Sequence, residues 1–348
     1  MSEKIQSIHY LRGVAALFVV VAHAGTEMLR HIPIGKYGVI IFFVISGFIM
    51  YVVARNQPPL RFIASRAIRI VPVYWIVLAV AWLKLTVAPE ILLATDPAVI
   101  EHWIKSMFFI PDHSPILVRH QILPLVVTGW TLFYEVVFYL IFAAAIIWKR
   151  PIFAPLFIIA AMQFLANAYY SSTPLDKQLT SPYWYYFIGG LIIGWAYTEG
   201  YISRIPLPIG LMATVVLLPL LLTTKSAAFL QLPYEQALRI VIVTAFVAGV
   251  VAIEPIAARY QSKAFDALGN ASYSIYLTHL VFSPHLTRSI MANFSMLNEC
   301  RDVIKLCVFT GISLAVGIAF YALIERPLIR WLKGISFGKT PLRSFQAP

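Results

Sequence analysis

Long apolar stretches separated by short polar turns run along nearly the whole chain. A helix needs about 20 predominantly apolar residues to cross the hydrocarbon core of a bilayer. The pattern therefore predicts an all-α integral membrane protein, a bundle of about ten transmembrane helices between residues 8 and 331. The predicted helices lie near 8–29, 37–54, 68–88, 129–148, 152–170, 183–199, 206–223, 238–257, 269–290 and 304–331.

The segment 89–128 interrupts this pattern. Pro111, Asp112 and Pro124 break its apolar runs, and a proline in a helix interior removes a backbone hydrogen bond. We expect an extramembrane or re-entrant segment that covers one face of the bundle. No internal repeat and no independent extramembrane domain is evident, so residues 1–348 are predicted to form a single transmembrane domain with a polar tail over 332–348.

Basic residues set the predicted orientation of the helices in the membrane. The chain contains 27 Lys and Arg against 15 Asp and Glu. With a cytoplasmic amino terminus, sixteen Lys and Arg fall on the cytoplasmic side and ten on the other, while Lys84 lies inside a helix. Cytoplasmic loops of membrane proteins carry such an excess of Lys and Arg. Both termini, including the tail, are therefore predicted to be cytoplasmic.

Composition supports the membrane class and argues against several others. Hydrophobic residues make up 60% of the chain, which would leave a soluble protein of 348 residues without enough polar surface. Basic residues are spread over short turns rather than gathered in a patch, so we predict no nucleic-acid partner. Cys300 and Cys307 form no disulfide framework, and the histidines lack ligand spacing, so we predict no metal site.

Two ionisable residues in the first predicted helix give the strongest functional signal, because such groups are costly within a membrane and usually mark a site. Arg12 and His23 are eleven residues apart. At about 100° per residue, this spacing puts them on one helix face with a rise of about 16 Å between them. One stripe therefore carries a cation near the membrane edge and an imidazole deep inside. Such a stripe would hold a phosphate-bearing donor and present its reactive end to the imidazole.

The turn between the second and third predicted helices carries further cations. Arg66 and Arg69 are three residues apart and share a helix face. Together with Arg12 they would form a cluster suited to phosphate groups. Ordinary positive-inside charge, or contact with anionic lipid headgroups, explains the pair about as well. Tyr74 and Trp75 belong by default to the interfacial aromatic belt.

The second and fourth predicted helices contain small and acidic residues in apolar surroundings. Ser46 and Gly47 allow close approach of another helix, or leave room for a thin, extended cofactor. Glu135 needs a partner in its apolar surroundings, and His23 and the arginines are the candidates. Pairing with His23 would orient the imidazole for general-base catalysis, whereas a structural ion pair is the alternative.

The last two predicted helices add three candidates. Tyr276 and His279 are three residues apart on one helix face, where a lone histidine is more often a hydrogen-bonded packing residue than a catalyst. Glu325 is expected at the cytoplasmic end of the last helix, paired with Arg326 or with arginines of the second-to-third turn. We therefore predict a structural role for Glu325.

Six motifs in order resemble the acyltransferase-3 family of integral membrane acyltransferases. They are Arg12 with His23 and the runs 42–48, 66–75, 130–139, 273–279 and 325–327, distributed over residues 5–333. Within the family, the runs 5–13 and 129–135 look most like bacterial acetyltransferases of exopolysaccharide production. Val136 stands where the family more commonly has a second glutamate, which argues against a mechanism that needs two adjacent carboxylates.

The resemblance implies transfer of an acyl group, usually acetyl, from cytoplasmic acyl-CoA to a hydroxyl of an exopolysaccharide or other cell-envelope carbohydrate. The protein would be a multi-pass protein of the bacterial inner membrane, with acyl-CoA as donor substrate and no tightly bound cofactor. The resemblance predicts no particular oligomeric state. His23 would act as general base or transient acyl carrier, together with Glu135. The donor would be bound by Arg12, Arg66, Arg69, Ser46, Gly47, Tyr74 and Trp75, with Tyr276 and His279 as further pocket candidates.

A transporter or flippase of an envelope substrate is the competing class, because intramembrane Arg, His and Glu also line substrate paths. Against this class, no inverted repeat is evident, and most buried ionisable groups lie in the first four predicted helices. A scaffold subunit of a polysaccharide-export assembly would leave the stripe of Arg12 and His23 unexplained. Release of free CoA thiol in the presence of acceptor would distinguish an acyltransferase from a flippase.

Overall fold

A computed structural model describes residues 4–87, 95–116, 121–169, 173–223, 235–292 and 301–337. Within these ranges the secondary structure is helical apart from one isolated β-bridge between His113 and Ile122, which confirms the predicted all-α class. The chain forms two compact units. The first comprises Met1–Ala54 and Tyr185–Pro348, and the second comprises Arg55–Trp184.

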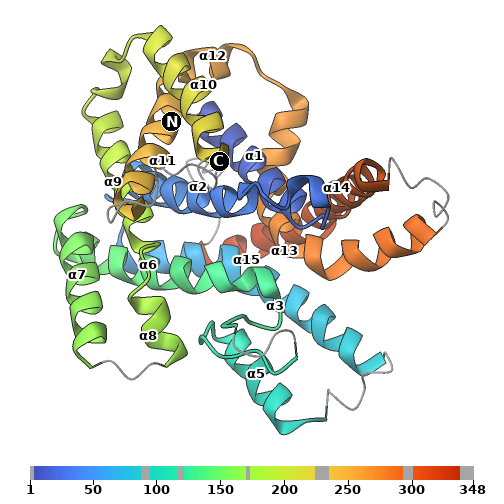
Figure 1. Cartoon of the computed structure of the whole chain (residues 1–348). Helices are drawn as coiled ribbons and strands as arrows, with labels where there is room; N and C mark the ends of the chain where they lie inside the picture. Colours follow the sequence, from blue (N-terminus) through green and yellow to red (C-terminus); the bar gives the residue numbers. More distant parts are fainter. Residues whose placement is uncertain are drawn as a thin grey trace. The chain divides into compact units, whose positions relative to one another are not determined.

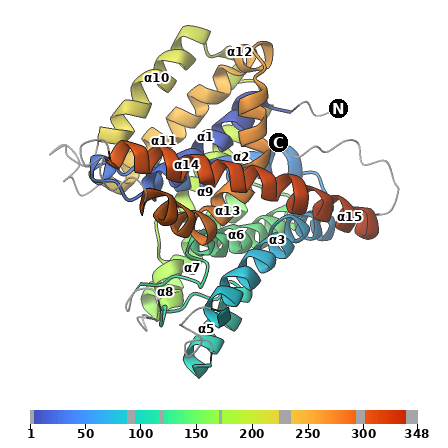
Figure 2. The same ribbon diagram turned by 90° about the vertical axis from the view of Figure 1, so that its right-hand side faces the viewer.

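The first unit is a bundle in which helices distant in sequence lie side by side. Helix α1 packs against α2 and α13, and α13 packs against α14 (Figure 1). Helices α10 and α11 also lie side by side (Figures 1 and 2). The bounds are α1 Gln6–Ala22, α2 Ile34–Ile49, α9 Trp184–Thr198, α10 Leu207–Thr223, α11 Glu235–Ala252, α12 Glu254–Arg259, α13 Lys263–Met291, α14 Arg301–Phe320 and α15 Arg326–Phe337.

Two π-helical turns modify the helices of this unit. Met50–Ala54 extends α2, and Tyr321–Glu325 joins α14 to α15, so that the two helices follow one another in Figure 2. Such turns are rare and occur frequently at functional sites. The second turn contains Glu325, one of the residues selected from the sequence.

The core of the first unit lies where α1, α13 and α14 meet. Ala16 and Val20 of α1 pack with Ile275 of α13 and Phe309 of α14, all at most 3% exposed. Burial of apolar side chains provides about 25 cal/mol per Å² of apolar surface removed from water. Because the core contacts join residues more than 250 positions apart in the sequence, they fix α1 against the carboxyl-terminal helices.

The amino-terminal end of α1 is capped by a residue from a distant helix. The backbone N–H groups of Gln6 and Ser7 donate to the two carboxylate oxygens of Glu254, at 2.8 and 2.7 Å. The first N–H groups of a helix have no partner within the helix, and a negative charge at this end is favourable. Glu254, the first residue of α12, therefore connects α1 to the short helix that precedes α13.

The second unit contains five helices within the described ranges. Helix α6 packs against α3 and α7, and α5 packs against α3. Its core is aromatic: the ring centroid of Phe62 lies 6.0 Å from that of Tyr139 and 5.7 Å from that of Phe142. The bounds are α3 Pro59–Val87, α5 Pro97–Met107, α6 Trp130–Ile147, α7 Phe153–Ala168 and α8 Pro174–Leu179.

Each of the ten apolar segments predicted from the sequence overlaps at least one helix. Within the described residues, five helices are long and apolar enough to cross a membrane, and three shorter apolar helices accompany them. Membrane-spanning character is therefore supported, while the number of ten spans and the location of the termini stay predictions. The five long helices are Ile34–Ala54, Pro59–Thr86, Val127–Ile147, Glu235–Ala252 and Arg301–Phe337.

The predicted boundaries were wrong at several places. The third helix was expected to begin near 68, but α3 begins at Pro59, so Arg66 lies within the helix and not in the turn before it. The segment 238–257 is divided between α11 and α12. The first helix was expected near 8–29, but α1 ends at Ala22, and Gly25 follows with a left-handed φ of 64°. Glycine shortly after the last helical residue is a common helix terminator. The last helix was expected to end near 331, but α15 continues to Phe337, so the beginning of the predicted tail is helical. Residues 338–348 lie outside the described ranges.

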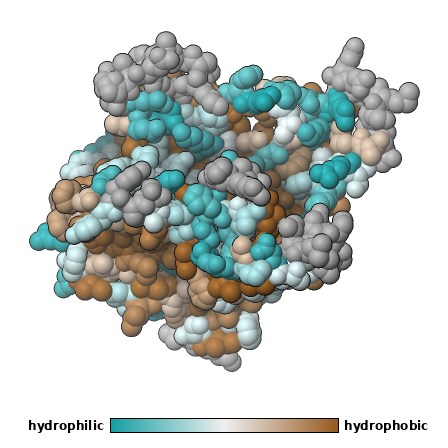
Figure 3. All heavy atoms as spheres, turned by 60° about the horizontal axis from the view of Figure 1, so that its bottom comes forward, coloured by the Kyte–Doolittle hydropathy of each residue, from teal (hydrophilic) through white to brown (hydrophobic). Residues whose placement is uncertain are grey.

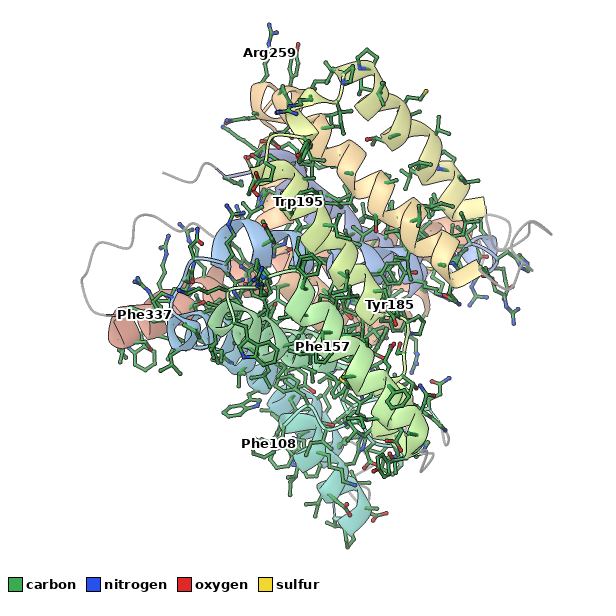
Figure 4. The ribbon with its side chains drawn as sticks, turned by 90° about the vertical axis from the view of Figure 1, so that its left-hand side faces the viewer. Phe108, Phe157, Tyr185, Trp195, Arg259 and Phe337 are labelled. Atoms are coloured by element: carbon green, nitrogen blue, oxygen red, sulfur yellow. The ribbon has the colours of Figure 1, made fainter. Side chains whose placement is uncertain are left out.

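Large apolar side chains are exposed on many helices. Phe157 of α7 is 69% exposed, Phe164 of the same helix 72%, and Leu323 after α14 76%. Figure 3 shows hydrophobic residues over broad areas of one face, with hydrophilic residues between them, and Figure 4 labels Phe157 and the exposed Trp195 of α9. Monomeric soluble proteins rarely expose apolar patches of this kind, so the surface fits a lipid environment.

Candidate active site

Arg12 and His23 lie on the same side of α1, as their spacing predicted. The Arg12 guanidinium donates to the hydroxyl of Ser272 at 3.2 Å, and His23 contacts His279. Ser272 and His279 both belong to α13, so the two ends of the stripe contact the same helix. Arg12 is 7% exposed, in accordance with a cation held inside the bundle rather than turned outward.

His23 was expected to lie deep inside a helix. It lies instead at the carboxyl end of α1. It is the residue that caps the carboxyl end of α1, and it is exposed. The reason is local: α1 ends at Ala22, and the left-handed φ of Gly25 shortly afterwards prevents the helix from continuing. The imidazole is therefore accessible at the end of the stripe rather than enclosed.

The hydrogen bonds of His23 and His279 assign the proton of each ring. The Nδ1 atom of His279 lies 2.8 Å from the carbonyl oxygen of Tyr276, which can only accept, so Nδ1 donates and Nε2 is an acceptor. The Nδ1 atom of His23 lies 2.8 Å from the carbonyl oxygen of Val19 and 3.3 Å from Nε2 of His279. His23 therefore carries its proton on Nδ1, and its Nε2 keeps a lone pair for chemistry.

Ser274 of α13 and Glu325 of the π-helical turn form a further buried polar contact. The Ser274 hydroxyl donates to the carboxylate of Glu325, and both residues are buried, at 0% and 4% exposed. Glu325 was expected to interact with Arg326 or with arginines of the second-to-third turn. Ser274 is an additional partner that connects the π-helical turn to α13, and the structural role of Glu325 stays a prediction.

Tyr276 lies one helical turn before His279 and is 7% exposed. Its ring meets that of Phe42 edge-on, with centroids 5.9 Å apart, so it joins α13 to α2. Its backbone carbonyl oxygen accepts the hydrogen bond from Nδ1–H of His279, as described above. Tyr276 thus supports the histidine pair through its backbone and its packing, and a direct role toward a ligand stays a prediction.

Sequence analysis missed a polar cluster at the other end of the stripe. His9 is completely buried, and its Nε2 lies 3.2 Å from the backbone oxygen of Asp266 and 3.5 Å from its carboxylate. Lys4 and Gln6 donate to the same carboxylate, both at 2.7 Å. The available signal was His9 itself, which is three residues before Arg12 and so shares its helix face.

A second cluster joins α3 and α6 in the other unit. Arg66 interacts electrostatically with Tyr139, Arg69 and Glu135, and the Tyr139 hydroxyl donates to the Glu135 carboxylate. The Arg66 Nε atom is buried and has no hydrogen-bond partner among the described residues. Glu135 therefore lies with the arginines, one of the two candidate sets of partners. Its pairing with His23 stays a prediction, because the two residues belong to different units.

The same division applies to the predicted cationic cluster. Arg12 lies in the first unit and Arg66 and Arg69 in the second, so a joint site for phosphate groups stays a prediction. Within the described ranges, no group of three or more His, Cys, Asp or Glu side chains is arranged to hold a metal ion.

The contacts of Gly47 support the packing interpretation. A Cβ atom built on Gly47 would lie 2.1 Å from the backbone oxygen of Phe187 and 3.1 Å from the Cα of Gly190. The backbones of α2 and α9 thus touch at this point, which only small residues permit. Ser46, the preceding residue, is half-buried. Roles of the pair in donor binding stay predictions.

Tyr74 and Trp75 point into different surroundings. Tyr74 is completely buried and stacks on Phe109, with ring centroids 4.9 Å apart. Trp75 is 41% exposed, and its indole N–H donates to the carbonyl oxygen of Met107 at 3.0 Å. The default interpretation as an interfacial pair therefore suits Trp75 better than Tyr74.

Comparison with known proteins identifies the chain's family. The acyltransferase-3 sequence model, described as an acyltransferase domain, matches residues 5–326. The chain belongs to the acyltransferase-3 family. The match spans both units and contains every site residue predicted from the sequence, from Arg12 to Glu325.

A curated protein is similar to this acyltransferase over most of its length. The exopolysaccharide production protein ExoZ of Rhizobium meliloti (strain 1021) is 32% identical over 316 residues, which cover 88% of this chain and 94% of ExoZ. No solved structure matches the acyltransferase. The resemblance that the six motifs predicted is thereby confirmed at the level of the family.

Proposed function

We propose that this acyltransferase moves an acyl group, most simply acetyl, from cytoplasmic acyl-CoA to a hydroxyl of an exopolysaccharide or another cell-envelope carbohydrate. The observation that carries the proposal is that the family match contains both polar clusters, the stripe of α1 and the Arg66–Glu135 cluster. The name of the relative, an exopolysaccharide production protein, supports a carbohydrate acceptor. The bacterial inner membrane is the location that suits such a donor and acceptor.

His23 supplies the base in this proposal. Its Nε2 lone pair takes the proton of the acceptor hydroxyl while the hydroxyl oxygen forms a bond to the thioester carbonyl carbon. The carbon–sulfur bond breaks, and the CoA thiolate leaves and takes up the proton. In the alternative path Nε2 attacks the thioester itself and passes the acyl group on afterwards. Both paths need the proton on Nδ1, which the carbonyl oxygen of Val19 holds there.

The arginines bind the phosphate groups of the donor. Guanidinium groups present several N–H donors in a plane that matches phosphate oxygens. The buried Arg66 Nε without a described partner supports a ligand at this residue, since buried polar groups normally have one. Arg12 and Arg69 provide further positive charge, and Glu135 with Tyr139 orients Arg66 from α6.

The proposal is tested by separating binding from chemistry in the purified protein. His23→Ala should reduce release of free thiol from acetyl-CoA by at least about a hundredfold, because general-base catalysis contributes this much. Its equilibrium binding of acetyl-CoA should stay within about twofold. Arg66→Ala should instead weaken acetyl-CoA binding by about tenfold, the effect of one charge-assisted hydrogen bond.

Arg150→Ala, in the exposed turn between α6 and α7, is the matched control and should change neither quantity. Thiol release that depends on added acceptor supports an acyltransferase, whereas acceptor transport without thiol release would support the flippase. Full activity of His23→Ala would contradict the assigned base.

A further inference from the structure

A small, half-open pocket lies in the second unit, beside the chain that connects α5 to α6. It is lined by residues of α3, of the chain between α5 and α6, of the first turn of α6 and of the end of α8. Six of the lining residues carry the argument: Tyr74, Phe109, Asp112, Trp130, Phe133 and Gln178. They combine four aromatic rings with a carboxylate and an amide.

The end of α5 positions the aromatic wall of the pocket. Phe109 adopts a left-handed φ of 57°, which is unusual for a residue with a bulky side chain. Its ring is stacked on Tyr74 with an interplanar angle of 27°. The N–H groups of Phe109 and Ile110 donate to the carbonyl oxygens of Ser106 and Lys105, at 3.2 and 2.9 Å, so this conformation ends α5 in a Schellman motif.

Tyr74 presents a polar atom with no described partner. Its hydroxyl is buried and makes no hydrogen bond among the residues that the structure describes. Gly129 leaves space for the ring, because a Cβ atom there would lie 2.8 Å from the Tyr74 ring and 2.9 Å from its hydroxyl. A fully buried tyrosine normally finds a partner for its hydroxyl, so this atom requires one from outside the described chain.

Asp112 is fixed in the pocket as a charged acceptor. Its carboxylate accepts from Lys105 Nζ and from the backbone N–H of His113, both at 2.9 Å, and His102 Nδ1 lies 3.7 Å away. Burial by itself raises the pKa of Asp112, but these hydrogen bonds and the charge of Lys105 outweigh burial and hold the pKa below its usual value. The carboxylate therefore stays ionised at neutral pH.

We infer that this pocket binds one edge of a pyranose ring of the carbohydrate acceptor, with Tyr74 and Asp112 as hydrogen-bonding residues and the aromatic side chains against the apolar C–H face. A sugar ring offers both an apolar face and a rim of hydroxyls, which matches aromatic walls with a few fixed polar groups. The inference rests on the proposed function for the identity of the ligand.

The charge of the pocket argues against the donor as its occupant. The adenine ring of acyl-CoA would also stack on aromatic side chains. The ribose attached to this ring carries phosphate groups, however, and the carboxylate of Asp112 would repel them. The neighbouring Lys105 already contacts Asp112 and, at 2.7 Å, Glu101. Tyr74 was expected to contact acyl-CoA, and the pocket assigns it to the acceptor instead.

The test measures the affinity for acceptor apart from the affinity for donor. Oligosaccharides released from exopolysaccharide and deacylated by mild alkali are titrated into the full-length protein in lipid nanodiscs, and KM values for both substrates are measured. Tyr74→Phe, which removes only the hydroxyl, should raise the acceptor Kd and KM by about fivefold. Asp112→Asn, which removes a charged acceptor, should raise them by about thirtyfold. The KM for acetyl-CoA should not change in either variant.

Matched controls outside the pocket are Tyr260→Phe and Glu199→Gln, both at exposed positions, and neither should alter acceptor affinity. Unchanged acceptor Kd and KM in Tyr74→Phe and Asp112→Asn would overturn the inference even if the enzyme transfers acyl groups normally. Oligosaccharide binding that these two variants weaken, in a wild-type protein that transfers no acyl group, would support the pocket while refuting the proposed function.

Discussion

His23 and His279 form a pair of imidazoles in which each ring has a distinct role. His279 is completely buried and bonded through Nδ1 to its own helix, so its Nε2 is a fixed acceptor. His23 is exposed, and its Nδ1–H points toward that acceptor and toward the carbonyl oxygen of Val19. His279 is therefore a positioning residue for His23, comparable to the second partner that holds a catalytic histidine in its tautomer.

This role predicts a selective effect of substitution. His279→Leu removes the acceptor, so kcat should fall by about tenfold while the KM for acetyl-CoA stays within about twofold. His279→Gln offers an amide oxygen and should recover part of the kcat. Steady-state thiol release measures both constants. His285→Leu, an exposed histidine on the same helix, is the control and should resemble the parent. A full kcat in His279→Leu would show that the Val19 carbonyl suffices.

The sequence predicted which residues of α1 share a helix face, but it did not predict which residues they contact. The eleven-residue spacing of Arg12 and His23 fixes their common side through helix geometry alone. Their partners Ser272 and His279 are about 260 residues away, and no local rule connects such positions. The buried His9 was missed for the same reason, because its partner Asp266 lies equally far along the chain.

Close contacts between helix backbones determine how the elements of the first unit pack. Gly13 of α1 faces Leu268 and Gly269 of α13, where an added Cβ would come within 2.8 Å of the Leu268 Cβ. Gly190 of α9 faces α2 even more closely, because an added Cβ there would lie 2.0 Å from the backbone oxygen of Val44. Membrane helices lack a hydrophobic driving force for association, so such close packing contributes much of their stability.

Substitution of these glycines should reveal the difference between packing and donor binding. Gly190→Ala forces α2 and α9 apart and should lower stability by about 1–3 kcal/mol, the usual cost of overpacking. Gly47→Ala should do the same and leave the KM for acetyl-CoA unchanged in the folded fraction. Thermal unfolding of the solubilised protein measures the stability, and steady-state thiol release measures the KM.

The control is Gly311→Ala in α14, where nothing lies within 4 Å of the added atom. It should be neutral or stabilise the helix by up to about 1 kcal/mol, since alanine favours helix more than glycine does. If Gly47→Ala raised the KM for acetyl-CoA without lowering stability, the alternative of a donor channel beside Gly47 would be correct.

Hydrophobic length predicted where helices occur but not where they end. All ten apolar segments overlap helices, because long apolar runs in a membrane protein have few other possibilities. The end of α1 depends on a single residue, Gly25, which lies within the apolar run, so length and hydrophobicity give no sign of this end. The π-helical turn that joins α14 to α15 could not be predicted from the length of the apolar segment.

The whole molecule distributes its proposed chemistry over two units. The first contains the histidine pair and Arg12, and the second contains Arg66, Arg69 and the aromatic pocket. The family match runs through both units, which supports a single enzyme rather than a catalytic unit with an unrelated appendage. The side of the membrane that each proposed site faces depends on the orientation of its unit, so this orientation matters for function.

The distribution of basic residues predicts this orientation. Arg150 lies in the exposed turn between α6 and α7 and is expected in the cytoplasm, whereas Lys177 in α8 is expected on the opposite side, beyond α7. In a variant with Cys300 and Cys307 replaced by serine, Arg150→Cys should react with a membrane-impermeant maleimide only after the cells are permeabilised. Lys177→Cys should react in intact spheroplasts. The opposite pattern would invert the unit and deny its arginines access to cytoplasmic acyl-CoA, whereas equal labelling of both positions would mean that α7, only 16 residues long, does not cross the bilayer.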